Sequence, residues 1–239
     1  MMQNALVRKT ITDLGNVFYP SVCLLCHERI ASQEFWLCGK CRDSLNELSK
    51  PICNKCGYPL ITDECPECAE NHYVFTQARA VFAYDNAAKA LVHALKYRGF
   101  TKLGDWFANQ IFLSEQGNNY LQEIDCVTAI PLHRVRKRER GFNQSELIAQ
   151  GLAFRLNKPY FPNLIIRKNY TVSQTTLTGK QRRKNLEGAF FSGKKSAEGL
   201  KVLLVDDVFT TGSTVNEATK VLLQKGAKDV YVLTACRGL

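Results

Sequence analysis

Two adjacent carboxylates precede a glycine surrounded by hydroxyl residues, near the C-terminal end of the sequence. Asp206 and Asp207 follow the apolar run 202–205, and Gly212 comes shortly after them. Carboxylates in this setting can accept hydrogen bonds from sugar hydroxyls or bind Mg²⁺, directly or through water. Gly212 lets the backbone approach a ligand closely, and hydroxyl side chains can donate hydrogen bonds to a phosphate. The pattern predicts a phosphate site beside an acidic pair, with Asp206 and Asp207 as candidate catalytic residues. The hydroxyl residues around the glycine are Thr210, Thr211, Ser213 and Thr214.

Eight of the ten cysteines form four Cys-x-x-Cys pairs between residues 23 and 68. Thiolates at this spacing are the usual ligands of tetrahedral structural zinc, so we expect two zinc ions with four thiolates each. A disulfide framework would require secretion, and a redox pair would require a thioredoxin-like context. We favour sequential sites, but a crossed pairing of the first and third pairs stays open. The predicted ligands are Cys23, Cys26, Cys38, Cys41, Cys53, Cys56, Cys65 and Cys68.

A basic segment lies between these two motifs. Five of the eight residues from His133 to Arg140 are Arg or Lys, and a second basic cluster occurs around residues 180–184. We interpret the first segment as a loop that suits pyrophosphate or a nucleic-acid backbone. Phe142 and Tyr170 lie near the two clusters and could stack on unpaired bases. The basic candidates are Arg134, Arg136, Lys137, Arg138, Arg140, Arg182 and Arg183.

Alternating strands and helices must position these groups. An α/β fold with a parallel sheet is predicted, because short apolar runs alternate with helical periodicity after about residue 75. The acidic pair then lies at the carboxyl end of a strand, where open sheets bind ligands, and the glycine opens a helix. Predicted strands cover 80–84, 126–130, 164–167, 201–205 and 230–235, and predicted helices cover 7–18, 87–95, 103–113, 145–156 and 214–225, with a loop at 116–120.

Length and charge set the outer limits. The chain of 239 residues has room for a small module, 1–72, and a medium domain, 73–239. Residues 1–70 hold 7 Lys and Arg against 9 Asp and Glu, whereas the remainder holds 25 against 13, so the positive charge belongs to the second domain. No window of 18 apolar residues suggests a membrane span, and the N-terminus does not resemble a signal peptide. We therefore expect a cytoplasmic protein.

The segment from Val202 to Thr214 resembles the signature of type I phosphoribosyltransferases, which bind 5-phosphoribosyl 1-pyrophosphate. The resemblance implies that the Thr-Thr-Gly-x-Thr loop holds the 5-phosphate, that the acidic pair faces the ribose, and that Mg²⁺ accompanies the ligand. It also implies the parallel-sheet fold of those enzymes behind a small N-terminal zinc-binding module. The residues assigned to this ligand are Asp206, Asp207, Thr210, Thr211, Gly212, Ser213 and Thr214.

The run Arg140-Gly141-Phe142-Asn143-Gln144, the phosphate segment and the cysteine pairs are together similar to the ComF competence family (ComFC and GntX-like proteins). The resemblance implies a competence protein that binds and handles incoming single-stranded DNA in the cytoplasm during natural transformation. A competence helicase or a membrane DNA channel is then a candidate partner. The alternative is an active phosphoribosyltransferase acting on a nucleobase, a nucleotide or another acceptor.

Overall fold

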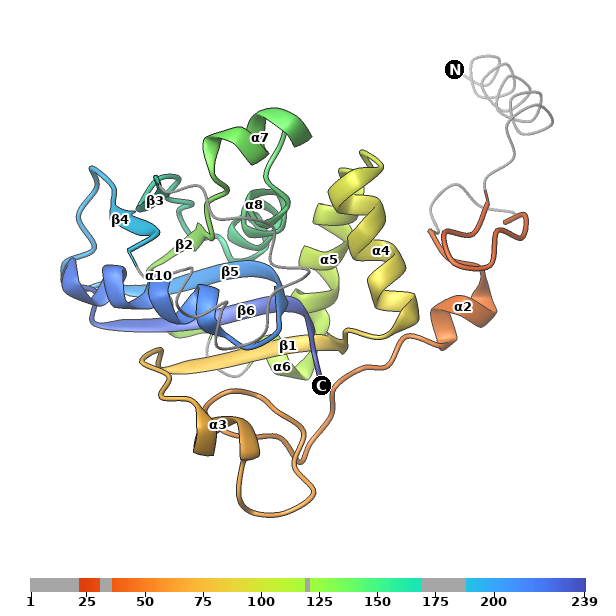
Figure 1. The fold of residues 1–239 in the computed structure, drawn as a ribbon, viewed down its shortest axis with the longest axis horizontal. Coiled ribbons are helices and arrows are strands. Elements are labelled where there is room, and N and C mark those ends of the chain that lie inside the picture. The colour runs from red at the N-terminus through yellow and green to blue at the C-terminus, as the bar shows by residue number, and fades with distance from the viewer. Residues whose placement is uncertain (1–21, 31–35, 119–120, 169–187) are drawn as a thin grey trace.

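A four-stranded parallel sheet forms the centre of the molecule. The computed structural model describes residues 22–30, 36–118, 121–168 and 188–239. The strand order is β1 (Gln77–Ala83), β6 (Asp229–Arg237), β5 (Lys201–Phe209) and β2 (Cys126–Ala129). Each neighbouring pair is parallel. The predicted α/β fold with a parallel sheet is confirmed, and all four strands present their carboxyl ends on one side, where the chain also ends (Figure 1).

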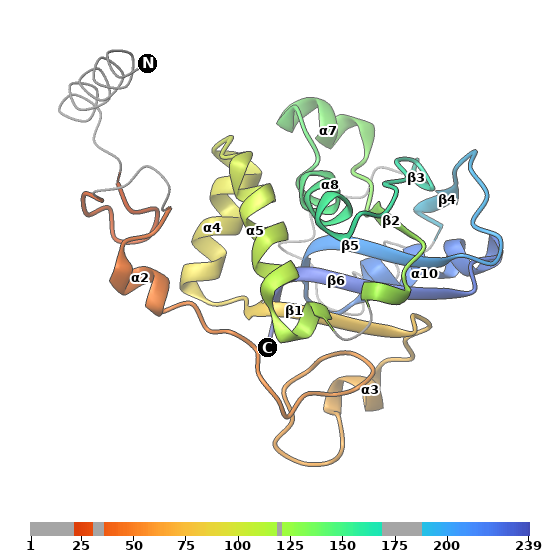
Figure 2. The same cartoon turned by 180° about the vertical axis from the view of Figure 1, so that it is seen from behind.

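Helices cover both faces of this sheet, so the strands are nearly all buried. Helices α4 (Asn86–Tyr97), α5 (Lys102–Leu113) and α8 (Gln144–Leu156) pack into one hydrophobic core with the face seen in Figure 2. Helix α10 (Ser213–Gln224) packs into a second core on the opposite face, seen in Figure 1. Burial on both faces explains why the strands are continuous apolar runs rather than alternating ones.

Strand β5 is longer than the sequence predicted, and this changes the place of the acidic pair. The apolar run ends at Val205, but the strand continues to Phe209 because β6 continues beside it, with Asp206 opposite Thr234 and Phe209 opposite Arg237. Asp206 and Asp207 therefore belong to the strand itself, near its carboxyl end as predicted.

Two local predictions were wrong. The basic segment expected as a loop is helix α7 (Arg134–Arg140), because Arg, Lys and Glu are good helix formers and the helix has proper ends. The His133 side chain accepts from the amide of Val135 at its start, and Gly141 ends it with φ 82°. The predicted loop at 116–120 overlaps a short helix, α6 (Glu115–Asn118), before the 3₁₀ turn η1 (Leu121–Glu123).

The remaining strands form a separate small sheet. Strand β3 (Ile165–Arg167) pairs antiparallel with β4 (Phe190–Ser192), which the sequence did not predict. The predicted strand at 164–167 is therefore confirmed as β3, whereas the three residues of β4 carry too little periodicity to be recognised on their own.

Two short helices, each starting directly after a cysteine, belong to the N-terminal part. Helix α2 (Gly39–Asp43) lies beside α4, and α3 (Pro66–Glu70) lies next to the β1 edge of the sheet (Figure 1). Between them, residues 46–48 run antiparallel to β1, with the amide of Leu48 donating to the Val81 carbonyl at 2.7 Å. The predicted helix at 7–18 lies outside the described residues, and the boundary at residue 72 stays a prediction. None of the described helices is long and apolar enough to cross a lipid bilayer.

Candidate functional site

The first acidic residue is held by the start of helix α8. Asp206 Oδ1 accepts hydrogen bonds from the Ser145 hydroxyl at 2.8 Å and from the Asp207 amide at 2.9 Å. Asn143 caps this helix: its side-chain oxygen accepts a hydrogen bond from the Ser145 backbone amide at 3.1 Å, and its side-chain nitrogen donates to the Ile130 carbonyl at 2.9 Å. The Gly-Phe-Asn-Gln run therefore fixes the helix start that supports the acidic pair, and Ser145 is a site residue that the sequence did not single out.

The second acidic residue is paired with a lysine from another helix. Lys96 Nζ, at the end of α4, lies 2.5 Å from Asp207 Oδ2, and the Asp207 side chain is 6% exposed. Burial disfavours the charged form of Lys96, but the Asp207 carboxylate outweighs burial and raises the pKa of Lys96 above its usual value. No local pattern in the sequence indicates this ion pair, because 110 residues separate its partners and Lys96 lies at the end of a typical helical run.

The surroundings of Asp206 change its tendency to hold a proton. Burial and the neighbouring Asp207 charge raise the pKa of Asp206 to about 7, although the Ser145 hydrogen bond and the Lys96 charge oppose the shift. Near neutral pH, Asp206 can therefore gain or lose a proton, which is the property of a general acid or base. Lys96 pairs with Asp207, and the charge of Asp206 depends on pH.

The hydroxyl-rich segment forms a tight turn between β5 and α10. This turn, residues 210–214, is called the phosphate loop below. Gly212 has φ 69°, and a Cβ there would lie 2.5 Å from the Phe209 ring and 2.7 Å from the Tyr73 ring, so only glycine fits. Thr211 Oγ1 lies 2.8 Å from Ser213 Oγ. Ser213 begins the 12-residue helix α10, whose first amide groups and dipole favour a bound anion.

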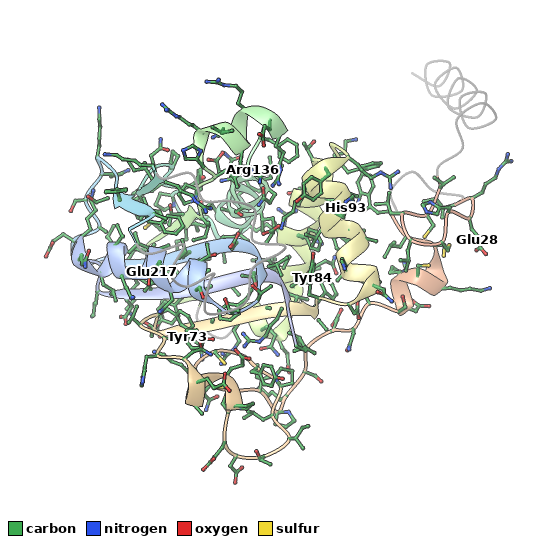
Figure 3. All side chains as sticks on the ribbon, in the orientation of Figure 1. Glu28, Tyr73, Tyr84, His93, Arg136 and Glu217 are labelled. Atoms are coloured by element: carbon green, nitrogen blue, oxygen red, sulfur yellow. The ribbon has the colours of Figure 1, made fainter. Side chains whose placement is uncertain are left out.

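Helix α7 supplies cations beside the acidic pair. A cavity of about 230 Å³ opens between the end of α4 and α7, lined among others by Lys96, Tyr97, Arg136, Arg140 and Phe142. The Arg140 guanidinium lies over the Tyr97 ring at 5.1 Å. Since Lys96 both lines this cavity and pairs with Asp207, the cavity adjoins the acidic pair. Arg136 of α7, labelled in Figure 3, is another of its lining residues.

The remaining predicted binding residues lie either on α7 or outside the described residues. Arg134, Lys137 and Arg138 are exposed on α7, and Lys137 pairs with Glu146 at 2.9 Å. Arg182, Arg183 and Tyr170 lie outside the described residues. His133 is buried and holds the helix start: its Nδ1 accepts from the Val135 amide at 3.3 Å, and its Nε2 lies 3.0 Å from the Lys168 carbonyl. The local packing gives it a structural role.

The cysteines form two clusters that suit zinc. Their sulfur atoms group as Cys23/Cys26/Cys38/Cys41 and Cys53/Cys56/Cys65/Cys68, all within 4.8 Å in each group. Sulfur–sulfur distances of 3.6 Å (Cys26 to Cys38, Cys56 to Cys65) and 3.7 Å (Cys53 to Cys68) match the roughly 3.8 Å edge of a tetrahedron with Zn–S bonds of about 2.3 Å. The sequential grouping is confirmed. Zinc held there would cross-link chain segments too short to build a core of their own.

Two family models match this chain. The double zinc ribbon domain matches residues 14–72, which include both cysteine clusters. The phosphoribosyl transferase domain matches residues 143–239, which include the acidic pair and the phosphate loop. The two matches therefore coincide with the cysteine clusters and with the site formed by the acidic pair and the phosphate loop.

Several known proteins are similar to this chain over most of its length. The DNA utilization protein YhgH of Salmonella typhimurium is 32% identical over 225 residues, which cover 92% of this chain and 98% of that protein. Competence protein ComFC of Bacillus subtilis is 29% identical, covering 90% of this chain and 93% of that protein. Competence protein F of Haemophilus influenzae is 28% identical, covering 90% and 96%. The chain therefore belongs to the ComFC/YhgH family of competence and DNA utilization proteins, with a double zinc ribbon followed by a phosphoribosyltransferase domain.

Proposed function

We propose that this protein binds incoming single-stranded DNA in the cytoplasm during natural transformation, and that it holds 5-phosphoribosyl 1-pyrophosphate with Mg²⁺ at the acidic pair. The observation that carries the proposal is the adjacency of three features at the carboxyl end of the sheet: the acidic pair, the phosphate loop and the arginines of α7. The names of the competence relatives support the DNA role. A competence helicase or a membrane DNA channel would act on the same strand.

The phosphoribosyl ligand would use each feature for one chemical group. The phosphate loop offers amide groups and hydroxyls to the 5-phosphate, and the acidic pair accepts hydrogen bonds from ribose hydroxyls. Arg136 and Arg140 line the neighbouring cavity and can bind pyrophosphate oxygens. Mg²⁺, when bound, would neutralise charge between the carboxylates and the pyrophosphate.

Single-stranded DNA would reach the same cavity from outside. Arg134 and Arg138 are exposed on α7 and can contact backbone phosphates. Tyr97 is 60% exposed at the cavity and Phe142 lines it, so both rings are accessible to an unpaired base. Because Arg136 and Arg140 would serve both ligands, we expect the phosphoribosyl ligand to weaken DNA binding.

A titration of labelled single-stranded DNA against salt concentration tests the DNA part. Each phosphate contact contributes about −0.7 to the slope of log affinity against log salt, so Arg134→Ala with Arg138→Ala should make the slope shallower by about 1.4. Lys194→Ala with Lys228→Ala removes the same charge from exposed positions outside α7 and should leave the slope close to that of the unsubstituted protein. Equal changes in both double variants would mean that α7 is not the DNA surface.

An active transferase is the second candidate, favoured by the pKa of about 7 at Asp206. A proton acceptor with that pKa, close to bound ribose, suits transfer to a nucleobase, a nucleotide or another acceptor. Pyrophosphate release with one of these acceptors, lost in Asp206→Asn, would support it. Absence of release with nucleobases, nucleotides and DNA ends would leave binding alone as the function.

A further inference from the structure

The second cysteine cluster, Cys53/Cys56/Cys65/Cys68, lies against the phosphate loop. Tyr73 follows this cluster, and its hydroxyl is 3.1 Å from the Thr211 carbonyl oxygen of the loop and 3.3 Å from Glu67 Oε2 of α3, so it can donate to either. Its ring packs edge-on against Phe209 at 5.9 Å and would touch any side chain at Gly212. Figure 3 shows Tyr73 between α3 and the sheet. One side chain therefore contacts both the zinc-ribbon helix and the loop.

The same segment fixes the start of helix α10. Asn216, in its first turns, accepts a hydrogen bond from the Val74 amide at 2.8 Å, and its side-chain amide donates to the His72 carbonyl at 3.2 Å. The Asn216 backbone amide in turn donates to the Gly212 carbonyl at 2.9 Å. Residues 72–74 thus hold the helix whose amide groups face the proposed phosphate.

A buried arginine makes the third connection. Arg237, at the end of β6, is 1% exposed and donates to the Cys56 carbonyl at 2.6 Å, with its other terminal nitrogen 3.6 Å from Cys56 Sγ. Its guanidinium lies over the Phe209 ring at 4.4 Å. Four thiolates around Zn²⁺ carry net negative charge, so a filled second cluster would hold this cation. Through Arg237 it would also hold Phe209, the last residue of β5 before the loop.

The first cluster packs elsewhere. Leu24 and Leu37, next to its cysteines, join the core formed by α4 and α5, and Trp36 packs edge-on against Phe100 at 5.6 Å. The two clusters contact different parts of the phosphoribosyltransferase domain, and the second is the one beside the site.

We propose that Tyr73, Asn216 and Arg237 are positioning residues through which zinc in the second cluster orders the phosphate loop and so sets its affinity for a ribose phosphate monoester. The choice of ligand rests on the proposed function; the coupling between metal and loop does not. Zinc in the first cluster has no part in this coupling.

The test uses the full-length zinc-loaded protein with two readouts. Amide hydrogen exchange of residues 209–216, measured without ligand, reports loop order, and calorimetry with ribose 5-phosphate reports affinity. Cys65→Ser should lose one zinc, speed exchange in 209–216 and weaken binding more than tenfold. Cys38→Ser should lose one zinc while exchange in 209–216 stays slow.

Conservative variants separate positioning from general stability. Tyr73→Phe keeps the ring and both zinc ions but loses a hydrogen bond of about 1 kcal/mol, so exchange should quicken and affinity should fall roughly fivefold. Gln77→Ala is the matched control, because the Gln77 side chain donates to the Asn54 carbonyl of the same cluster but is absent from the loop contacts described above. It should leave affinity unchanged at a similar unfolding temperature.

Slow loop exchange in both Cys65→Ser and Tyr73→Phe would overturn the proposal, as would equal effects of Cys65→Ser and Cys38→Ser. If Cys65→Ser fails to fold, unchanged loop exchange in Tyr73→Phe overturns it alone. A protein that does not bind ribose 5-phosphate but loses loop order with the second zinc would refute the proposed ligand and keep the coupling.

Discussion

Burying Asp206 should cost the protein stability, and Asp206→Asn measures how much. The asparagine has nearly the same shape, and its Oδ1 can still accept from the Ser145 hydroxyl and the Asp207 amide. Only the titratable charge is removed. The carboxylate stands in a low-dielectric site beside another carboxylate, a location that a ligand-binding role would explain better than a folding role.

The pKa gives the size and sign of the effect. Asp206 has a pKa of about 7 in the folded chain, against about 3.9 when unfolded, so the folded state binds more protons between these values. Its contribution to stability is full below about pH 3.9 and is lost as the pH rises to about 7. The total loss is about 4 kcal/mol, of which about 2 kcal/mol falls between about pH 5.5 and about pH 8.5.

Denaturant unfolding of both proteins across that pH range is the assay. Acid releases zinc and destabilises both proteins equally, so the difference between their unfolding free energies is the quantity to follow. We expect Asp206→Asn to be the more stable protein at alkaline pH, by a margin that grows by about 2 kcal/mol over the range. Asp63→Asn, at an exposed carboxylate, is the control. A margin that is constant or shrinks with rising pH would refute the assignment of a raised pKa to Asp206.

Three further predictions concern the ion pair, the loop and the metals. Lys96→Met leaves Asp207 buried without its partner and should lower the unfolding free energy by about 3–5 kcal/mol at alkaline pH. Lys89→Met, at an exposed position on the same helix, should cost little, and equal losses in the two variants would argue against the ion pair. Gly212→Ala should lower the unfolding temperature by more than Gly199→Ala does, because Gly199 has a similar φ of 68° but open space where a Cβ would lie. Similar losses in the two variants would mean that the contacts with Phe209 and Tyr73 do not constrain the loop. Elemental analysis should find two zinc ions per chain in the unsubstituted protein. The double variant Cys23→Ser with Cys53→Ser should hold none, because each of the two sequential sites then lacks one ligand. One retained zinc ion would favour the crossed pairing, in which both substitutions fall in the same site.

The sequence predicted those parts of the molecule that local pattern determines. The sheet, its main helices, the phosphate loop after β5 and the cysteine ligands all follow from runs and spacings within about 20 residues. Strand β5 extended past its apolar run because β6 pairs with it, and this pairing is invisible to local periodicity. The loop predicted at 133–140 rests on the charge of this segment, whereas the helix propensity of its residues decides the structure of α7.

The site residues that the sequence did not predict were missed for a different reason. Lys96, Ser145 and Tyr73 each act through contacts with a segment far away in the chain, at Asp207, Asp206 and Thr211 respectively. Nothing in their local sequence distinguishes them from ordinary helix and loop residues. Such partners are found only when the fold brings the segments together.

The most direct test of the central claim is a titration of single-stranded DNA with and without 5-phosphoribosyl 1-pyrophosphate and Mg²⁺, at several salt concentrations. The account predicts DNA binding that weakens steeply with salt and weakens further when the phosphoribosyl ligand is present, because both ligands need Arg136 and Arg140. DNA affinity that is unchanged by salt and by the ligand would contradict it.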